Sequence, residues 1–118
     1  MSADDNDAAA LARTWIECWN EGTPDAIPLA PGFKHTSPFG RVEGRERYLE
    51  WVKPLAAENV TELKILRTMS SGKDAAIHFV MQTPKGPIEV CDWVVVEGGE
   101  IVEIHSFYDA GPLRDSSS

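Results

Sequence analysis

Two side chains of this sequence could move protons: an aspartate inside an apolar stretch and a histidine far from it in the chain. Residues 88–96 read IEVCDWVVV, with Asp92 in the middle. A carboxyl group in apolar surroundings has a raised pKa, which suits it to acid or base chemistry near neutral pH. The imidazole of His35, in FKHTSPFG, is also suited to proton transfer. Each also has a structural interpretation: Asp92 as a hydrogen-bonded or solvent-reaching strand residue, His35 as the cap of a backbone group.

The composition limits the kinds of binding partner to be expected and indicates the cellular compartment. The chain has 118 residues and a net charge of −8, and such an acidic surface repels phosphate backbones and anionic lipid. We therefore expect neither nucleic acid nor membrane as a partner. Cys18 and Cys91 form no CxxC pair, and the N-terminus lacks the pattern of a secretory signal, which favours a cytoplasmic protein. We expect one domain over residues 1–118, with an ordered core from about 7 to 113.

The elements that must position these side chains follow from hydrophobic spacing. Residues 7–21 have helical spacing, Thr23 and Pro24 open a short second helix, and residues 43–58 predict a third helix that Pro54 ends or kinks. Strand-like segments separated by turn residues follow, at 60–69, 74–83, 87–96 and 100–109. This order predicts an α+β fold, with three N-terminal helices packed on one face of a curved antiparallel sheet.

Alternation along the third of these strands predicts where Asp92 points. Successive side chains of a strand face opposite sides of the sheet. Asp92 therefore lies on the more uniformly apolar face, with Ile88, Val90, Val94 and Val96. That face should meet the helices, and a buried carboxylate without a partner is costly.

Four segments together resemble a known family. LARTWIECWNEGTPDAI, FKHTSPFG, GRERYLEWV and IEVCDWVVVEGGEIVEIHSFYD look like the nuclear-transport-factor-2-like superfamily. Within it, the chain is most similar to SnoaL-like polyketide cyclases and ketosteroid isomerases, from about Ala8 to Leu113. The resemblance implies a cystatin-like roll, in which a strongly curved antiparallel sheet forms a cone around the helices. It also implies a hydrophobic pocket at one end of the cone and a homodimer through the outer sheet face.

When the functional positions of the family are transferred to this sequence, the resemblance supports Asp92 as a site residue and argues against two of the family's known activities. VCDWV places Asp92 where ketosteroid isomerases and SnoaL-type cyclases have a functional aspartate. Ser37 stands at the position of the isomerase general base, and Trp15 at that of its oxyanion-binding tyrosine, so ketosteroid isomerase activity is not expected. Ser106 stands near the position of the aspartate that limonene-type epoxide hydrolases need, so that activity is not expected either.

Strand alternation and the helix faces predict the rest of the pocket lining. The mixture is mostly apolar and aromatic with a few polar groups, which is typical of a small-molecule site. The predicted ligand-binding residues are Trp15, Trp19, Phe33, Ser37, Trp51, Ile77, Phe79, Val90, Ser106 and Tyr108, with Tyr48, Met81 and Ile104 as further inward-facing candidates. We expect a flat or hydrophobic small molecule as ligand.

The opposite strand faces carry a second group of residues. His78 and His105 have the parity of the outer face, which they share with Val80, Trp93, Val95 and Phe107. This face is apolar for a solvent-exposed surface, which favours a dimer interface. The histidine spacing does not resemble a metal site, so no metal is expected.

These observations leave three hypotheses open. The first is an enzyme without a cofactor that isomerises, cyclises or hydrates a small hydrophobic carbonyl compound. In it, Asp92 and His35 are catalytic, and Tyr108 and Ser37 position the substrate. The alternative is a non-catalytic ligand-binding or dimeric accessory protein of the same fold. The third is a protein-interaction module, as in the nuclear transport members of the superfamily.

Overall fold

The structure, a computed structural model, describes residues 3–59, 62–109 and 111. Its elements are α1 (Ala3–Glu21), the 3₁₀ helix η1 (Pro24–Ala26), β1 (Leu29–Ser37), β2 (Gly40–Glu43), α2 (Arg45–Asn59), β3 (Glu62–Ser71), β4 (Asp74–Thr83), β5 (Gly86–Glu97) and β6 (Glu100–Phe107). The α+β class is confirmed. The first helix begins before the predicted residue 7, and the predicted end of the ordered core, residue 113, lies outside the described residues.

The helices differ from the prediction in one respect. The short second helix is only the three residues of η1, so two α-helices rather than three cover the sheet. Of the two effects predicted for Pro54, ending the helix does not occur, since α2 contains Pro54 and continues to Asn59. The backbone carbonyl that a helical proline at this position leaves unpaired is that of Glu50, an exposed residue, so water can satisfy it. Neither α-helix is long and apolar enough to cross a membrane.

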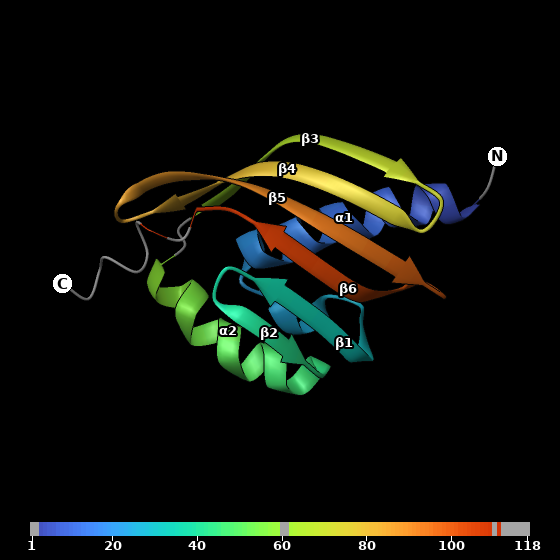
Figure 1. The fold of residues 1–118 in the computed structure, drawn as a ribbon, viewed down its shortest axis with the longest axis horizontal. Helices are drawn as coiled ribbons and strands as arrows, with labels where there is room; N and C mark the ends of the chain where they lie inside the picture. The colour runs from blue at the N-terminus through green and yellow to red at the C-terminus, as the bar shows by residue number, and fades with distance from the viewer. Residues whose placement is uncertain (1–2, 60–61, 110, 112–118) are drawn as a thin grey trace.

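The sheet is larger and more mixed than predicted. Its six strands run in the order β2-β1-β6-β5-β4-β3, because the segment around FKHTSPFG forms a hairpin, β1 and β2, that joins the edge of β6 (Figure 1). β1 pairs with β6 in parallel, whereas all other neighbours are antiparallel. The prediction of a purely antiparallel sheet is therefore wrong. Local sequence does not show which edge a hairpin will join, because that pairing is decided by tertiary packing.

Alternating burial along β5 confirms the predicted orientation of Asp92. The residues Ile88, Val90, Asp92, Val94 and Val96 are buried, and their neighbours are exposed or half-buried. The β5–β6 turn contains Gly98 (φ +60°) and Gly99 (φ +81°), which both adopt the left-handed conformation that a tight hairpin turn requires. An irregularity between Val95 and Val96 then shifts the pairing by one residue, and Asp92 lies directly opposite Ser106 on β6.

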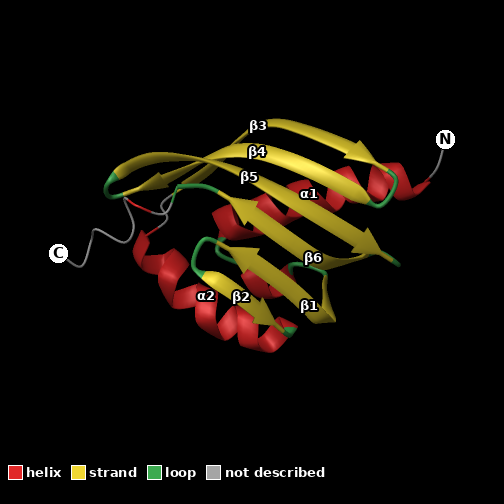
Figure 2. Ribbon diagram, viewed as in Figure 1, coloured by secondary structure: helices red, strands yellow, loops and turns green. Residues whose placement is uncertain are grey.

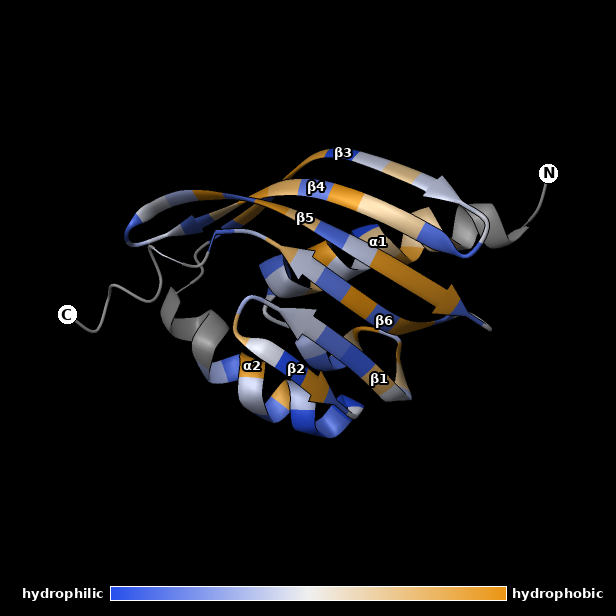
Figure 3. Ribbon diagram, in the orientation of Figure 1, coloured by the Kyte–Doolittle hydropathy of each residue, from blue (hydrophilic) through white to orange (hydrophobic). Residues whose placement is uncertain are grey.

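The helices and the curved sheet enclose a single hydrophobic core. α1 packs against β3, β4 and β5, and α2 packs against β1 and β2. Figure 2 shows these two helices and the twisted sheet, and Figure 3 shows hydrophobic stretches along β4, β5 and β6. Fully buried side chains from both layers fill the core, among them Ile16, Phe33, Ile77, Val94 and Ile104.

Candidate active site between the helices and the sheet

A cavity of about 450 Å³ lies between the helices and the inner face of the sheet. Most of its wall is apolar or aromatic, with polar groups at the deep end and at the exposed end. The lining residues are Trp15, Trp19, Gly22, Pro24, Asp25, His35, Tyr48, Val52, Lys53, Leu63, Phe79, Met81, Val90, Asp92, Ser106 and Tyr108. A space of this size is in the range of pockets that hold small organic ligands.

Asp92 is the most deeply buried carboxylate among the described side chains, with 2% of its surface exposed. Its Oδ2 accepts a hydrogen bond of 3.0 Å from the indole Nε1 of Trp15, which α1 brings over the sheet. Its Oδ1 is buried and has no hydrogen-bond partner among the described residues. Burial raises the pKa of Asp92 to about 6, although the hydrogen bonds of Ser106 and Trp15 oppose this rise. A carboxyl group of this kind can exchange a proton near neutral pH.

His35 reaches the same cavity from β1. Its Nε2 lies 3.0 Å from the hydroxyl oxygen of Ser106, and its Nδ1 is buried with no partner among the described residues. Its ring packs against that of Tyr48, with centroids 4.9 Å apart. Burial, and secondarily the charge of His105, lowers the pKa of His35 to about 4. The imidazole is therefore neutral at pH 7, with one ring nitrogen available as a base.

Tyr48 supplies a third polar group to the cavity. Its position on α2 places it against the rings of Trp15 and Phe33. Burial, then the nearby Asp92 and then Tyr108, raises the pKa of Tyr48 well above its ordinary value. Its hydroxyl therefore keeps its proton at neutral pH and can donate a hydrogen bond to an oxygen that gains negative charge.

The structure brings most of the predicted site residues together. Asp92 and His35 both line the cavity, and so do the predicted ligand-binding residues Trp15, Trp19, Phe79, Val90, Ser106 and Tyr108. Of the further inward-facing candidates, Tyr48 and Met81 line it, and Ile104 lies in the buried core instead.

Four predicted ligand-binding residues lie outside the lining. Phe33 and Ile77 are fully buried behind it, and Ile77 is the β4 neighbour of Asp92. Trp51 lines a separate hollow between α2 and β2, together with Arg41 and Val42. Ser37 ends β1, and its hydroxyl accepts the backbone N–H of Phe39 at the turn, so the position of the isomerase general base holds a turn-stabilising serine here.

The exposed end of the cavity was missed by sequence reasoning. It contains Gly22, Pro24 and Asp25, around η1, together with Lys53 from α2, whose Nζ lies 2.8 Å from Asp25 Oδ2. Val52 and Leu63 complete the missed lining. Val52 follows Tyr48 by one helical turn and could have been inferred from that spacing. The residues around η1 carry no pattern that would have indicated them.

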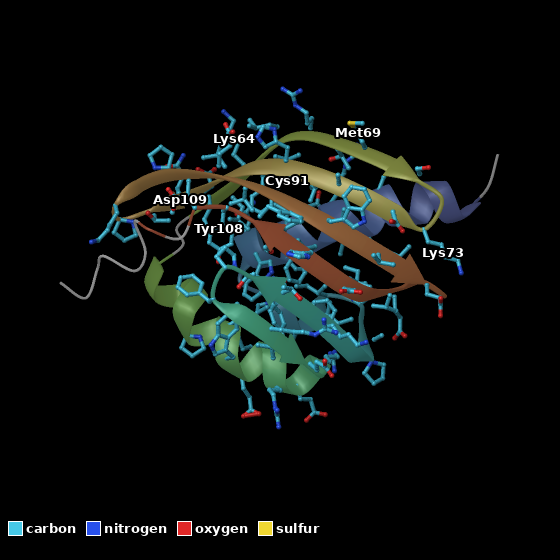
Figure 4. The ribbon with its side chains drawn as sticks, viewed as in Figure 1. Lys64, Met69, Lys73, Cys91, Tyr108 and Asp109 are labelled. Carbon is cyan, nitrogen blue, oxygen red and sulfur yellow. The ribbon has the colours of Figure 1, made fainter. Side chains whose placement is uncertain are left out.

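The opposite face of the same strands is exposed and partly apolar. Trp93 and Phe107 have 46% and 52% of their surfaces exposed, and Leu66 and Met69 on β3 are also exposed. The ring of His105 stacks on that of Phe107, with centroids 4.2 Å apart. Figure 4 shows Met69 projecting from β3 away from the helices.

Among the described residues, no three His, Cys, Asp or Glu side chains are placed to hold a metal ion. Apart from the Asp25–Lys53 pair at the exposed end, the polar groups that line the cavity are the Asp92 carboxyl, the His35 imidazole, the indoles of Trp15 and Trp19 and the hydroxyls of Tyr48, Ser106 and Tyr108. This set of side chains is suited to acid–base chemistry and hydrogen bonding.

Solved structures support the fold. A putative SnoaL-like polyketide cyclase from Jannaschia sp. CCS1 superposes with a TM-score of 0.81 at 15% identity, covering 97% of this chain and 93% of that one. A putative ketosteroid isomerase from Kribbella flavida gives 0.79 at 21% identity, covering 90% and 80%. A protein with a ketosteroid isomerase-like fold from Catenulispora acidiphila, in complex with trimethylamine, gives 0.74 at 17% identity, covering 84% and 85%.

A search of curated proteins returns no match for this chain. The SnoaL-like domain, however, matches residues 12–104, which is most of the sequence and includes Trp15, His35 and Asp92. With the matching architecture, this shows that the chain belongs to the SnoaL-like domain family.

Proposed function

We propose that this protein is a proton-transfer enzyme that needs no cofactor and isomerises, cyclises or hydrates a small hydrophobic carbonyl compound. The observation that carries the proposal is the fully buried Asp92 carboxyl group on the wall of an apolar cavity, with the neutral imidazole of His35 on the same wall. The resemblance of the fold to cyclases and isomerases supports it.

The chemistry follows from the protonation states of the two groups. A proton on a carbon next to a carbonyl group needs a base, and the neutral His35 has an unprotonated ring nitrogen. Removal of that proton places negative charge on the carbonyl oxygen. The hydroxyl of Tyr48, or Asp92 when it is protonated, can donate a hydrogen bond to this oxygen. Return of the proton to another atom completes an isomerisation, and attack of the enolate on a second carbonyl group completes a cyclisation.

The wall of the cavity determines the substrate class. Phe79, Met81, Val90 and Leu63 favour an apolar body. Polar groups are concentrated near Asp92, so a single carbonyl group is expected at the deep end. A sugar phosphate fits poorly, because the deep end offers a carboxylate where a phosphate group would need cations.

The proposal can be tested without knowledge of the natural product of the reaction. A panel of small cyclic and aromatic ketones is incubated with the protein in D₂O, and exchange of the hydrogens next to the carbonyl group is followed by NMR. Catalysed exchange reports proton abstraction directly. We expect exchange for at least one apolar ketone, and its loss in Asp92→Asn and His35→Gln.

A matched control is Asp74→Asn, which changes a carboxylate on the outer face of β4 that also accepts an indole N–H. It should leave exchange unchanged. Binding of the ketones without exchange in the wild-type protein would contradict the enzymatic proposal.

Ligand binding without turnover is the second candidate. Trp15, which donates to the Asp92 carboxyl group, packs its ring against those of Trp19 and Tyr48, and aromatic rings near a carboxylate also attract organic cations. The trimethylamine complex of the Catenulispora acidiphila protein favours testing such a ligand. Calorimetric titration with trimethylammonium chloride should show binding that is weakened in Asp92→Asn if this candidate is correct.

We also propose that the protein is a cytoplasmic homodimer that pairs through the outer sheet face. The exposed Trp93, Phe107 and Met69 support such an interface, and the free thiols of Cys18 and Cys91 are compatible with a reducing compartment. Light scattering after size exclusion should give the mass of a dimer for the wild-type protein and of a monomer for Phe107→Lys. A monomeric wild-type protein would contradict the dimer.

A further inference from the structure

The charged groups at the two ends of the cavity differ. Asp92, which is 2% exposed, is the charged group of the deep end. At the exposed end, Lys53 Nζ lies 2.8 Å from Asp25 Oδ2. Among the described residues that line the cavity, Lys53 is the one lysine or arginine. A ligand carboxylate therefore meets a cation at the exposed end and an anion at the deep end.

Lys53 has hydrogen-bonding capacity that the protein does not use. An ammonium group has three N–H donors, and Asp25 Oδ2 is the one hydrogen-bond acceptor of Lys53 among the described residues. The side chain of Lys53 is 43% exposed, so water takes the remaining donors. A ligand oxygen can replace this water without breaking the bond to Asp25, which holds Nζ beside the cavity.

Asp25 does not prevent an anion from binding at this end. Its side chain is 67% exposed, so water screens much of its charge. The guanidinium group of Arg45 donates to the backbone oxygen of Asp25 at 3.3 Å, so a second cation stays near Asp25 when Lys53 binds a ligand. An exposed Lys–Asp pair is also weak, and a ligand carboxylate can compete for the lysine.

The spacing of residues along α2 indicates the length of the ligand. Tyr48, whose ring stacks on that of Trp15, is 1% exposed. Lys53 follows it on the same helix after a rise of roughly 7–8 Å along the axis. Val52, which also lines the cavity, lies between them along the helix. A ligand that reaches both Tyr48 and Lys53 therefore needs an apolar segment between two polar groups.

We propose that Lys53 is a specificity-determining residue, which binds a carboxylate at the end of the substrate that lies farther from the reacting carbonyl group. The substrate class is then a hydrophobic keto acid rather than a neutral ketone. This inference rests on the proposed function, because it assigns the carbonyl group to the deep end of the same cavity.

The difference between the two ends also determines the direction in which such a substrate binds. The reverse orientation would place its carboxylate next to Asp92, where burial already disfavours one negative charge, as the raised pKa of Asp92 indicates. With the carboxylate at Lys53, the charge stays near solvent and the apolar body enters the cavity. Lys53 therefore directs the carbonyl group toward Tyr48 and Asp92.

A series of ligands with matched shapes tests this assignment by binding alone. The probes are ω-benzoylalkanoates with two to five methylene groups between ketone and carboxylate, each paired with its neutral methyl ester. Calorimetry at pH 7 and low salt measures their dissociation constants for the wild-type protein. We expect the acid to bind about 3- to 10-fold more tightly than its ester. The ratio should be largest for the longer acids, whose polar groups can reach Tyr48 and Lys53 together.

Lysine variants show whether Lys53 is the cause of this preference. In Lys53→Gln, the acid should lose its advantage over the ester, whereas the affinity for the ester should stay as in wild type. Lys53→Arg keeps the charge and should retain most of the preference. The matched control is Lys73→Gln, which removes another exposed lysine with an ion pair, outside the described cavity wall, and should change neither affinity.

Three results would each overturn the role of Lys53: equal affinities of acid and ester for the wild-type protein, no measurable binding of any acid in the series, or a preference that survives in Lys53→Gln. The proposed function fails in a different way. An acid that binds through Lys53 but shows no hydrogen exchange in D₂O contradicts the enzyme and not the role of Lys53. Exchange of neutral ketones without any preference for the acids contradicts the role of Lys53 and not the enzyme.

Discussion

A hydrogen bond from a tryptophan indole to an aspartate carboxylate occurs on both faces of this sheet, in two different environments. On the inner face, Trp15 Nε1 donates to Asp92 Oδ2 at 3.0 Å, and on the outer face, Trp93 Nε1 donates to Asp74 Oδ2 at the same distance. The inner carboxyl is almost completely buried, whereas the outer pair lies at the surface. The inner pair therefore shows that a matching hydrogen bond does not offset burial, because desolvation raises the pKa of Asp92 in spite of it.

The largest difference between the inner and outer aspartates should appear in the rate of catalysed proton transfer. Asp92→Asn removes an acid–base group from the cavity and should reduce catalysed ketone exchange by about 10²- to 10⁴-fold, the usual contribution of such a group. Asp74→Asn makes the same chemical change on the outer face and should have no effect. NMR exchange rates measure both, and equal losses in the two variants would remove the functional distinction between the faces.

The pH dependence of stability should reveal two opposing contributions from the inner face. Asp92 has a folded pKa raised from 3.8 to about 6, so its contribution lowers stability as pH rises through this range. His35 has a folded pKa lowered from 6.5 to about 4, so its contribution raises stability as pH rises through nearly the same range. Each amounts to something on the order of 3 kcal/mol, and in the wild-type protein they should largely cancel.

Variants separate these two contributions. Relative to wild type, the free energy of unfolding of Asp92→Asn should increase between pH 4 and 6, and that of His35→Gln should decrease between pH 4 and 6.5. Urea denaturation at a series of pH values measures both slopes. Parallel curves for wild type and both variants would show that neither group is desolvated in the folded protein.

The two indole donors should differ in their effect on stability. Trp15→Phe leaves the buried Asp92 Oδ2 without its donor and should lower the free energy of unfolding by about 1–3 kcal/mol. Trp93→Phe removes the exposed donor and should change it by less than about 0.5 kcal/mol. Urea denaturation at pH 7 measures both changes. Equal losses in the free energy of unfolding for the two substitutions would contradict the expected difference.

The smallest effects are expected for ion pairs in solvent. Two ion pairs are largely exposed: Lys53 with Asp25, at the exposed end of the cavity, and Lys73 of the β3–β4 turn with Glu97 at the end of β5. Lys53→Gln and Lys73→Gln should each change the free energy of unfolding by at most about 1 kcal/mol. Urea denaturation measures both changes. If Lys53→Gln lowers the free energy of unfolding by clearly more than this, the Lys53–Asp25 pair is shielded from water despite its exposed surface.

Local pattern was sufficient to predict some features and insufficient for others. Alternation along β5 placed Asp92 on the buried face, and the turn glycines placed the hairpins. The same reasoning put Phe33 and Ile77 in the pocket, although both lie behind its wall, because parity distinguishes the faces of a sheet but not the depth within a core. The exposed end of the cavity, with Lys53 and Asp25, depends on how η1 meets α2, which no local pattern describes.

The sequence by itself determined the class of fold and the direction of the aspartate in its strand. These depend on backbone periodicity and on the apolar pattern, which are properties of neighbouring residues. The family followed from the resemblance of four segments, and the match over residues 12–104 shows it. Only the tertiary structure decided the partners of that aspartate. Trp15 is 77 residues from Asp92, and His35 is 71 residues from Ser106. They meet because α1 crosses the sheet and β1 joins β6 in parallel, and such meetings depend on the packing of whole elements.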